Sequence, residues 1–521
     1  MALGRISLAA ACTLGCRAAW NLLPGSGPAA PITAGPPTAA RTAIPSPAAT
    51  LAPTPGPMEE DDAAQGQGLL PEFAADLAAA QGATRYFLDV SVDFDPAGQQ
   101  ARIDGIARIL ITNREDTDWN DLPLMLWPND PQYRSSMTVG AALVDGELVA
   151  PDPELNGLAV RLELPQPLAP DRTVDISLPF SVDAGGPIGG ARPYRFGITD
   201  GVLLAPTFYP LVPRRLDGGW EVAAAPPNGD TTNSDVSLYR LRIRAPAGYA
   251  LISSGVEVGR QEDRTTQTVD FVTGPMRDVA FALGDLVMDS RSAGPVSVRV
   301  WLLPEHADEM DPILRAAAFQ TSLLAEHIGP YPYPELDVVD APGAFGGIEY
   351  PGLVFIGTVG GADAISPTVH EVAHQWFYGL IGSDQLREPW LDEAAATYSE
   401  VLYDEGRHGS GRATGLLSEF RAWLRVHPEA ETPIGMPVAE YEGLSDYGLF
   451  VYLKGALFFD ALRTELGDER FFAFLHEYYD RYAYGFADAA GFQAEAEDEC
   501  GCDLEALFDL WVFEGGPLPG P

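Results

Sequence analysis

Lysine is almost absent from this sequence: one of its 32 cationic side chains is Lys454, and the other 31 are arginine. The 74 carboxylate side chains outnumber these cations, which gives a net charge of −42 and an isoelectric point of about 4.3. A chain with this charge repels phosphate groups, which argues against nucleic acid and anionic membrane surfaces as partners. The charge predicts a solvated acidic surface.

Long apolar runs and cysteines are also scarce. No stretch of 18 or more apolar residues occurs, and we therefore expect no membrane-spanning helix. Of the four cysteines, Cys12 and Cys16 lie near the start, which leaves Cys500 and Cys502 for the folded part. Spaced by one residue, these two could form a local disulfide or stay as thiols, and they are too few for a zinc site of their own.

The first 57 residues differ in composition from the rest. One arginine, a short apolar stretch and small residues precede the last cysteine of "MALGRISLAAACTLGC", which predicts an export signal over residues 1–21, of general or lipoprotein type. In the lipoprotein case the lipidated residue is Cys16 or Cys12. Residues 22–83 are predicted to be a Pro/Ala-rich tether and lead-in. We expect an exported protein, extracellular or at the cell surface, with a lipid anchor to the membrane in the lipoprotein case.

Hydrophobic periodicity divides the remaining chain into two domains. Between residues 84 and 290, segments such as "RYFLDVSVDFD" and "TVDISLPFSV" alternate apolar and polar residues, which is typical of strands with one buried face. From 291 to 521 the spacing is mainly helical, as in "DPILRAAAFQTSLLAEHIG", with two short strands in "LDVVDAPGAFGGIEYPGLVFIG". We predict a multidomain protein, with an N-terminal antiparallel β domain over 84–290 and a mainly helical α+β domain over 291–521.

Two of the seven histidines form an H-E-x-x-H motif in "TVHEVAHQWFYG". Four residues apart on a helix, His370 and His374 lie on one face, where both imidazoles can reach one cation. Glu371 projects nearby and could take a proton from an attacking water. Glu393, in "EPWLDEAAATYSE", follows His374 by 19 residues in a segment of helical spacing. Two histidines and one carboxylate, with a position left for water, predict a catalytic site for one Zn²⁺ ion per chain.

These motifs resemble those of the gluzincin zinc aminopeptidases, the family of membrane alanyl aminopeptidase and leukotriene hydrolase. The resemblance rests on "HEVAHQWFYG" followed by "WLDEAAATY", and it extends over roughly residues 325–460. It implies a thermolysin-like catalytic domain that follows a saddle-shaped β domain. It also implies that His370, His374 and Glu393 bind the zinc ion and that Glu371 is the general base.

The resemblance also assigns a substrate-binding loop. The family's Gly-x-Met-Glu-Asn motif, whose glutamate binds the α-ammonium group of the substrate, matches Gly346, Gly347, Ile348, Glu349 and Tyr350. Substrate binding by Glu349, Gly346 and Gly347 is therefore implied. Tyr350 stands in place of the usual asparagine.

A further segment of the family, Tyr-x-Lys-Gly, carries a catalytic tyrosine about 60 residues after the zinc glutamate. Here Tyr452 follows Glu393 by 59 residues in "YLKG", so the resemblance implies that its phenol donates to the oxyanion. Lys454 lies about 200° further round a helix and would face away. This predicts a structural role for the only lysine, with its ammonium bound to carbonyls or a carboxylate. Glu400, on the same helical face as Glu393, is predicted to orient a ligand histidine.

The predicted function is hydrolysis of the N-terminal peptide bond of peptides by a zinc-dependent aminopeptidase. Two alternatives remain open. The chain ends soon after the predicted catalytic domain, and a more open cleft would suit an endopeptidase of thermolysin type. The other alternative is a non-catalytic surface binding protein on a peptidase scaffold, although the predicted base, tyrosine and metal ligands are all present.

Overall fold

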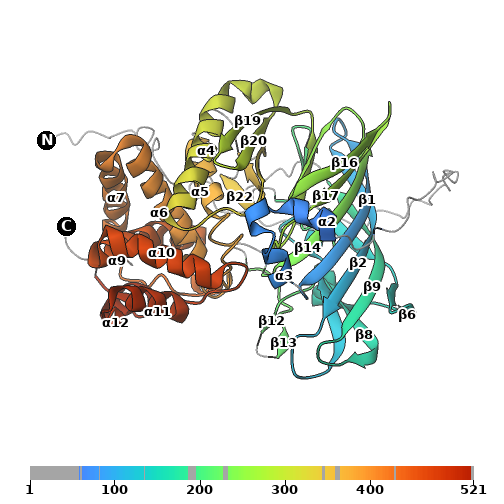
Figure 1. Cartoon of the computed structure of the whole chain (residues 1–521), viewed down its shortest axis with the longest axis horizontal. Helices are drawn as coiled ribbons and strands as arrows, with labels where there is room; N and C mark the ends of the chain where they lie inside the picture. The colour runs from blue at the N-terminus through green and yellow to red at the C-terminus, as the bar shows by residue number, and fades with distance from the viewer. Residues whose placement is uncertain are drawn as a thin grey trace, which may run out of the picture.

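The structure is a computed structural model that describes residues 58, 62–80, 82–133, 135–185, 195–216, 218–226, 233–342, 346–357, 364–427 and 430–517. The predicted export signal, its cysteines and most of the tether lie outside these ranges and stay predictions. A strand-rich domain is followed by a mainly helical one, with a smaller sheet between them (Figure 1). Within the described ranges, no helix combines the length and apolar character needed to cross a bilayer.

The first domain is built on a large sheet whose strands follow the predicted alternation. In β1, Tyr86, Leu88 and Val90 are buried, whereas Ser91 and Asp93 are exposed. In the described residues the sheet has nine strands, ordered β16-β17-β14-β1-β2-β9-β5-β6, with β4 paired to β9. They are β1 (Thr84–Asp95), β2 (Gln100–Thr112), β4 (Ser135–Val139), β5 (Ala142–Val144), β6 (Glu147–Val149), β9 (Thr173–Ala184), β14 (Ser237–Pro246), β16 (Val256–Glu262) and β17 (Thr266–Val272).

Neighbouring strands of this sheet are antiparallel except β1 and β14, which run parallel with Tyr86 opposite Tyr239. Two parallel neighbouring strands need a long connection between them, and here the chain from β2 to β13 connects β1 to β14. Smaller sheets complete the domain. Their strands are β10 (Gly197–Thr199), β11 (Val202–Pro206), β15 (Ala250–Ser253), β18 (Ala280–Gly284), β3 (Trp119–Met125), β7 (Asp152–Glu154), β8 (Ala159–Leu168), β12 (Arg215–Leu216) and β13 (Gly219–Trp220).

The second domain begins with a five-stranded sheet in the described residues, ordered β19-β20-β21-β23-β22. Its first strand starts at Val287, so residue 290 falls inside it. The strands are β19 (Val287–Ala293), β20 (Val296–Leu302), β21 (Glu335–Asp340), β22 (Gly347–Tyr350) and β23 (Leu353–Ile356). A β domain followed by a mainly helical domain confirms the predicted fold class.

Helices make up most of the rest of this domain, and their bounds are as follows. They are α4 (Met310–His327), α5 (Ile365–Ala373), α6 (Trp390–His408), α7 (Ser410–Arg425), α8 (Leu444–Tyr447), α9 (Gly455–Leu466), α10 (Asp468–Tyr482), α11 (Ala489–Cys500) and α12 (Glu505–Phe508), with π-helices η8 (Gly448–Lys454) and η9 (Asp509–Phe513). Cys500, the last residue of α11, forms a disulfide with Cys502, which decides between the two alternatives for this pair.

Part of the predicted lead-in is folded against both domains. It contains the short helices α2 (Asp62–Gln65) and α3 (Asp76–Ala79), which lie beside the large sheet in Figure 1. The Gln65 amide donates to the carbonyl oxygen of Thr273 at 2.6 Å, in the first domain. Tyr484, between α10 and α11, donates its hydroxyl to Asp76 at 2.9 Å. These contacts connect the lead-in to both halves of the molecule.

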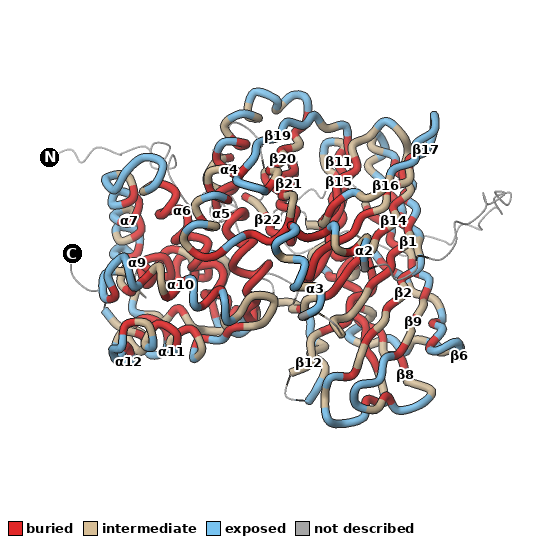
Figure 2. The backbone as a smooth tube through the Cα atoms, viewed as in Figure 1, coloured by how far each residue is buried: buried red, intermediate tan, exposed pale blue. Residues whose placement is uncertain are grey.

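Two buried helices provide the frame for the candidate site. Every residue of α5 from Pro367 to Ala373 is buried, and so is every residue of α6 from Trp390 to Asp404 (Figure 2). The two helices pack against each other, and α5 also contacts β22 and β23. Polar side chains on these helices are therefore held away from bulk water.

Candidate metal centre and active site

The three predicted metal ligands come from the facing ends of α5 and α6. His370 lies in the last turn of α5, and His374 is the residue that caps this helix. Glu393 lies in the first turn of α6. Their side chains are 5%, 1% and 6% exposed, respectively, so all three functional groups are withdrawn from solvent.

Three ligand atoms of these residues form a small triangle. The Nε2 atoms of His370 and His374 are 3.2 Å apart. Oε2 of Glu393 lies 3.1 Å from Nε2 of His370 and 3.3 Å from Nε2 of His374. The structure therefore brings together all three residues that the motif predicted.

The other ring nitrogens show which atoms carry protons. Nδ1 of His374 lies 3.1 Å from the backbone oxygen of Phe377, and a carbonyl oxygen can only accept, so this Nδ1 is protonated. Nδ1 of His370 lies 3.0 Å from Oε1 of Glu400, so the Glu400 carboxylate is placed to orient this imidazole, as the sequence predicted. In neutral imidazoles, both Nε2 atoms then present lone pairs to the Glu393 carboxylate.

Such a triangle of acceptors calls for a cation. Four ligands at about 2.0–2.1 Å from a tetrahedral zinc ion are about 3.3 Å apart, which matches the observed edges. Burial lowers the pKa of His370, but its hydrogen bonds to Glu393 and Glu400 outweigh burial and raise the pKa to about 9. The site thus attracts positive charge, and its nitrogen and oxygen donors fit zinc.

A second group of carboxylates adjoins the triangle. One donor atom from each of Glu349, Glu371 and His374 lies within 4.8 Å of the others, and all three residues are buried. Glu371 approaches the backbone of β22 closely: a Cβ atom on Gly347 would lie 2.4 Å from its Oε1. Gly347 is therefore required for space, and a larger residue would displace Glu371.

Strand alternation explains why Tyr350 does not disturb this group. Successive side chains of β22 point to opposite faces, so Glu349 faces the metal site while Ile348 and Tyr350 face the other way. Both belong to a buried apolar cluster with Phe355, whose ring centroid is 5.5 Å from that of Tyr350. Gly346 accepts a hydrogen bond from the backbone N–H of Gly357 at 2.9 Å, which fixes the start of the strand.

Tyr452 lies against the metal ligands. Its ring stacks on that of His370, with centroids 5.6 Å apart and planes 13° from parallel. Its hydroxyl donates to Oε1 of Glu393, the oxygen that does not form the triangle. Tyr452 is on π-helix η8, a type of helix that often occurs at functional sites. The hydroxyl is thus beside the position where the metal would polarise a substrate.

Comparison with known proteins agrees with this geometry. Residues 322–511 match the model of the Peptidase family M1 domain. The chain therefore carries a domain of this family over these residues. The match confirms the resemblance to the gluzincin aminopeptidases.

Relatives and solved structures extend the comparison. Aminopeptidase M1-B of Oryza sativa subsp. japonica is 27% identical over 302 residues, which cover 53% of this chain and 34% of the relative. Aminopeptidase N of Streptomyces lividans is 27% identical over 156 residues, or 28% of this chain and 18% of the relative. The chain thus spans about one third or less of the length of these two relatives. An M1 zinc metallopeptidase of Deinococcus radiodurans has a similar fold, with a TM-score of 0.63, 21% identity, and coverage of 84% of this chain and 96% of that one.

Lys454 of the family M1 domain lies on the far side of η8 from Tyr452. It is 1% exposed, and its ammonium donates to the carbonyl oxygens of Ala430 at 3.0 Å and Thr432 at 2.7 Å. Burial lowers its pKa to about 8. The only lysine therefore holds the loop after α7 against η8, which is the carbonyl-binding role that the sequence predicted.

Replacing Lys454 by methionine should destabilise the domain by about 2–3 kcal/mol, because two buried carbonyls lose a charged donor. Chemical denaturation of the zinc-loaded protein measures this change. Arg425→Met, at an exposed cation at the end of α7, is the matched control and should change stability by less than about 0.5 kcal/mol. Equal stability of the two variants would show that the Lys454 contacts contribute nothing.

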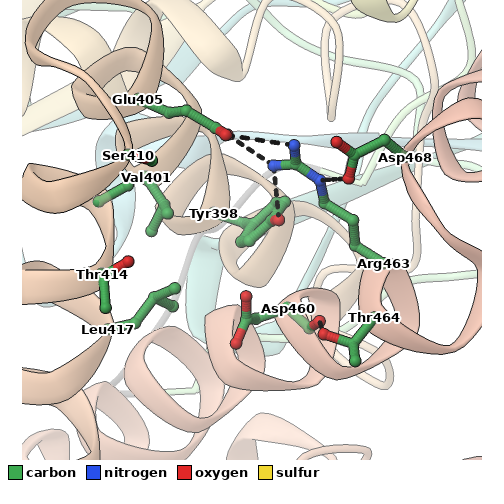
Figure 3. A pocket seen from close by; sticks show the side chains of 11 residues that line it. Tyr398, Val401, Glu405, Ser410, Thr414, Leu417, Asp460, Arg463, Thr464 and Asp468 are labelled. Carbon is green, nitrogen blue, oxygen red and sulfur yellow. Dashed lines mark hydrogen bonds and ion pairs between the residues drawn. The ribbon is translucent and has the colours of Figure 1, made fainter.

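A separate cavity of about 210 Å³ lies between α6, α7 and α9 of the family M1 domain (Figure 3). Arg463 lies at its edge and donates to Glu405 at 2.6 Å and to Asp468 at 2.8 Å. None of the three metal ligands is among the described residues that line it. Arg463 pairs with two of the three carboxylates that line the cavity, and we assign the cavity no part in the candidate site.

Two contributions to the site were not predicted from the sequence. The backbone oxygen of Phe377 orients His374. Every residue has a carbonyl oxygen, so the sequence does not indicate which one has this role. Gln375 follows the H-E-x-x-H motif directly, and its Oε1 accepts from the N–H of Gly352 at 2.8 Å while its Nε2 donates to the carbonyl of Tyr350 at 3.2 Å. It joins the end of α5 to the β22–β23 hairpin that carries Glu349. Its position directly after the motif is the signal that could have indicated this role.

Proposed function

We propose that the chain is a zinc-dependent aminopeptidase that hydrolyses the N-terminal bond of peptides. The observation that carries this proposal is the pair of buried carboxylates, Glu349 and Glu371, beside the acceptor triangle. One carboxylate is needed as a base, and the second suits the free α-ammonium group of a peptide. An internal peptide segment, as an endopeptidase binds it, has no charged amino group to compensate a second buried carboxylate at this place.

The residues around the metal divide the chemistry among them. His370, His374 and Glu393 would hold zinc, which supplies the Lewis acidity that activates water and polarises the scissile carbonyl. Glu371 takes the proton of the attacking water and passes it to the leaving amine.

Two further residues bind the reacting peptide. Tyr452 turns its hydroxyl from Glu393 to the oxyanion as charge develops there. Glu349 binds the ammonium group and thereby sets the first peptide bond at the metal.

The relatives support this reading. The relatives from Oryza sativa subsp. japonica and Streptomyces lividans are both named aminopeptidases. Structures of the Deinococcus radiodurans relative and of a two-domain M1 zinc metallopeptidase were determined with the peptide Tyr-Ser-Ala and with L-arginine, respectively. Each of these ligands has a free α-amino group, which is the group that we assign to Glu349.

The purified protein should contain about one zinc ion per chain, and chelation should abolish peptide cleavage until zinc is restored. His374→Ala should lose the ion and the activity. His408→Ala is the matched control, because His408 is half-exposed at the other end of α6 and lies outside the triangle. Elemental analysis and hydrolysis of amino-acid amides measure both effects. Full activity in metal-free protein would disprove the zinc assignment.

A further inference from the structure

The turn that follows α5 contains an unusual backbone conformation. Tyr378, four residues after His374, has φ of +104°, which L side chains rarely adopt. It is also buried, with 4% of its surface exposed. A non-glycine residue keeps such a conformation only where its surroundings enforce it.

This conformation bears directly on a metal ligand. The peptide between Phe377 and Tyr378 accepts from Nδ1 of His374 through its carbonyl oxygen, and its N–H donates to the carbonyl of Ile381 at 2.8 Å. Rotation about φ of Tyr378 would swing this peptide and take the carbonyl oxygen away from the imidazole. The value of φ therefore determines whether His374 keeps its orienting acceptor.

Two consecutive residues of the strand-rich domain hold Tyr378 from both ends. Nε of Arg277 donates to the Tyr378 carbonyl at 2.6 Å, and Asp278 accepts from the Tyr378 hydroxyl at 2.8 Å. Arg277 and Asp278 are 1% and 0% exposed. Both precede β18, about 100 residues before the turn, so these contacts cross from one domain to the other.

The guanidinium of Arg277 is itself fixed by the helical domain. It donates to the carbonyl oxygens of Leu380, at 3.4 Å, and of Gly485. Its centre lies 4.3 Å from the ring centroid of Phe486. A Cβ atom on Gly382 would lie 2.3 Å from Cζ of Arg277, so only glycine leaves room for it. The planar, forked donor group can serve several carbonyls at once, which the single ammonium of a lysine cannot do in the same directions.

We propose that Arg277 and Asp278 are positioning residues for the metal ligand His374, through the strained Tyr378 and the carbonyl oxygen of Phe377. Docking of the strand-rich domain then completes the zinc site of the other domain. The inference rests on the proposed zinc site. It adds that zinc affinity depends on residues that touch neither the ion nor its ligands.

Zinc affinity of the folded chain tests this inference. Arg277→Lys and Tyr378→Phe should each weaken zinc binding about 10-fold in competition with a chelator, the lower end of the range for partners of metal ligands. The visible spectrum of the cobalt(II)-loaded variants should also shift, because the direction of the His374 imidazole changes. Tyr378→Phe removes a single hydroxyl and keeps the test available if Arg277→Lys does not fold.

Arg214→Met is the matched control for domain docking. Arg214 packs on Phe486 with its guanidinium carbon 3.6 Å from the ring centroid, so its loss weakens the same junction. It should lower the melting temperature but leave zinc affinity and the cobalt spectrum unchanged. Unchanged affinity in both Arg277→Lys and Tyr378→Phe would overturn the inference while the zinc site stands. A failure of the unaltered chain to bind zinc would overturn both proposals.

Discussion

Replacing Glu371 by glutamine should lower kcat at least about 100-fold, while the variant keeps about one zinc ion per chain. Glu371 is 3% exposed and adjoins the triangle without being part of it. Glutamine has the same size and fits beneath Gly347, but it cannot take a proton from water. Zinc analysis and steady-state kinetics on one peptide measure the two quantities.

Glu405→Gln is a suitable control for this variant, because Glu405 belongs to α6 and pairs with Arg463 away from the metal ligands. It should keep both zinc and kcat. If Glu371→Gln instead lost zinc in proportion to its rate, Glu371 would be a ligand and its role as a base would be wrong.

Replacing Glu349 by alanine should lower kcat/KM on peptides with a free amino group by a factor between about 30 and 4,000. Removing one partner of a buried charge pair costs about 2–5 kcal/mol, and each 1.4 kcal/mol is a tenfold change. Glu349 is 6% exposed, so little water is available to replace it around the substrate ammonium.

One peptide, with and without an N-terminal acetyl group, completes this test. The native protein should cleave the acetylated form poorly, and Glu349→Ala should remove the preference for the free amine. Mass spectrometry identifies the bond that is cut. Equal cleavage of both forms at an internal bond would make the protein an endopeptidase and would leave the zinc site unaffected.

Local patterns in the sequence predicted the residues whose role depends on spacing. The four-residue interval between His370 and His374 places both rings on one side of α5, and the burial alternation of β1 follows its apolar residues. Glu400 and Lys454 were also placed correctly, because a helical repeat determines which residues share a face with Glu393 or lie opposite Tyr452. Helical and strand periodicity is set by the backbone, so such predictions need no tertiary information.

Contacts between distant segments could not be predicted in this way. Arg277 reaches Tyr378 across 101 residues, and its acceptors there are carbonyl oxygens that every residue has. The packing of Gln65 on the backbone of Thr273 is a contact of the same kind. The parallel pairing of β1 with β14 is a third case, since alternation shows which face of a strand is buried but not which strand lies beside it.

Because the only lysine is buried, cleavage of the peptide bond after it can report local unfolding. A lysine-specific endoprotease can cut this chain at a single place, after Lys454, and the native structure encloses that place between η8 and α9. Cleavage therefore requires that this segment unfolds, and its rate reports the equilibrium between closed and open forms. Tyr452 lies two residues before the cut, so the same digestion follows the opening of the catalytic centre itself, without any label or engineered site.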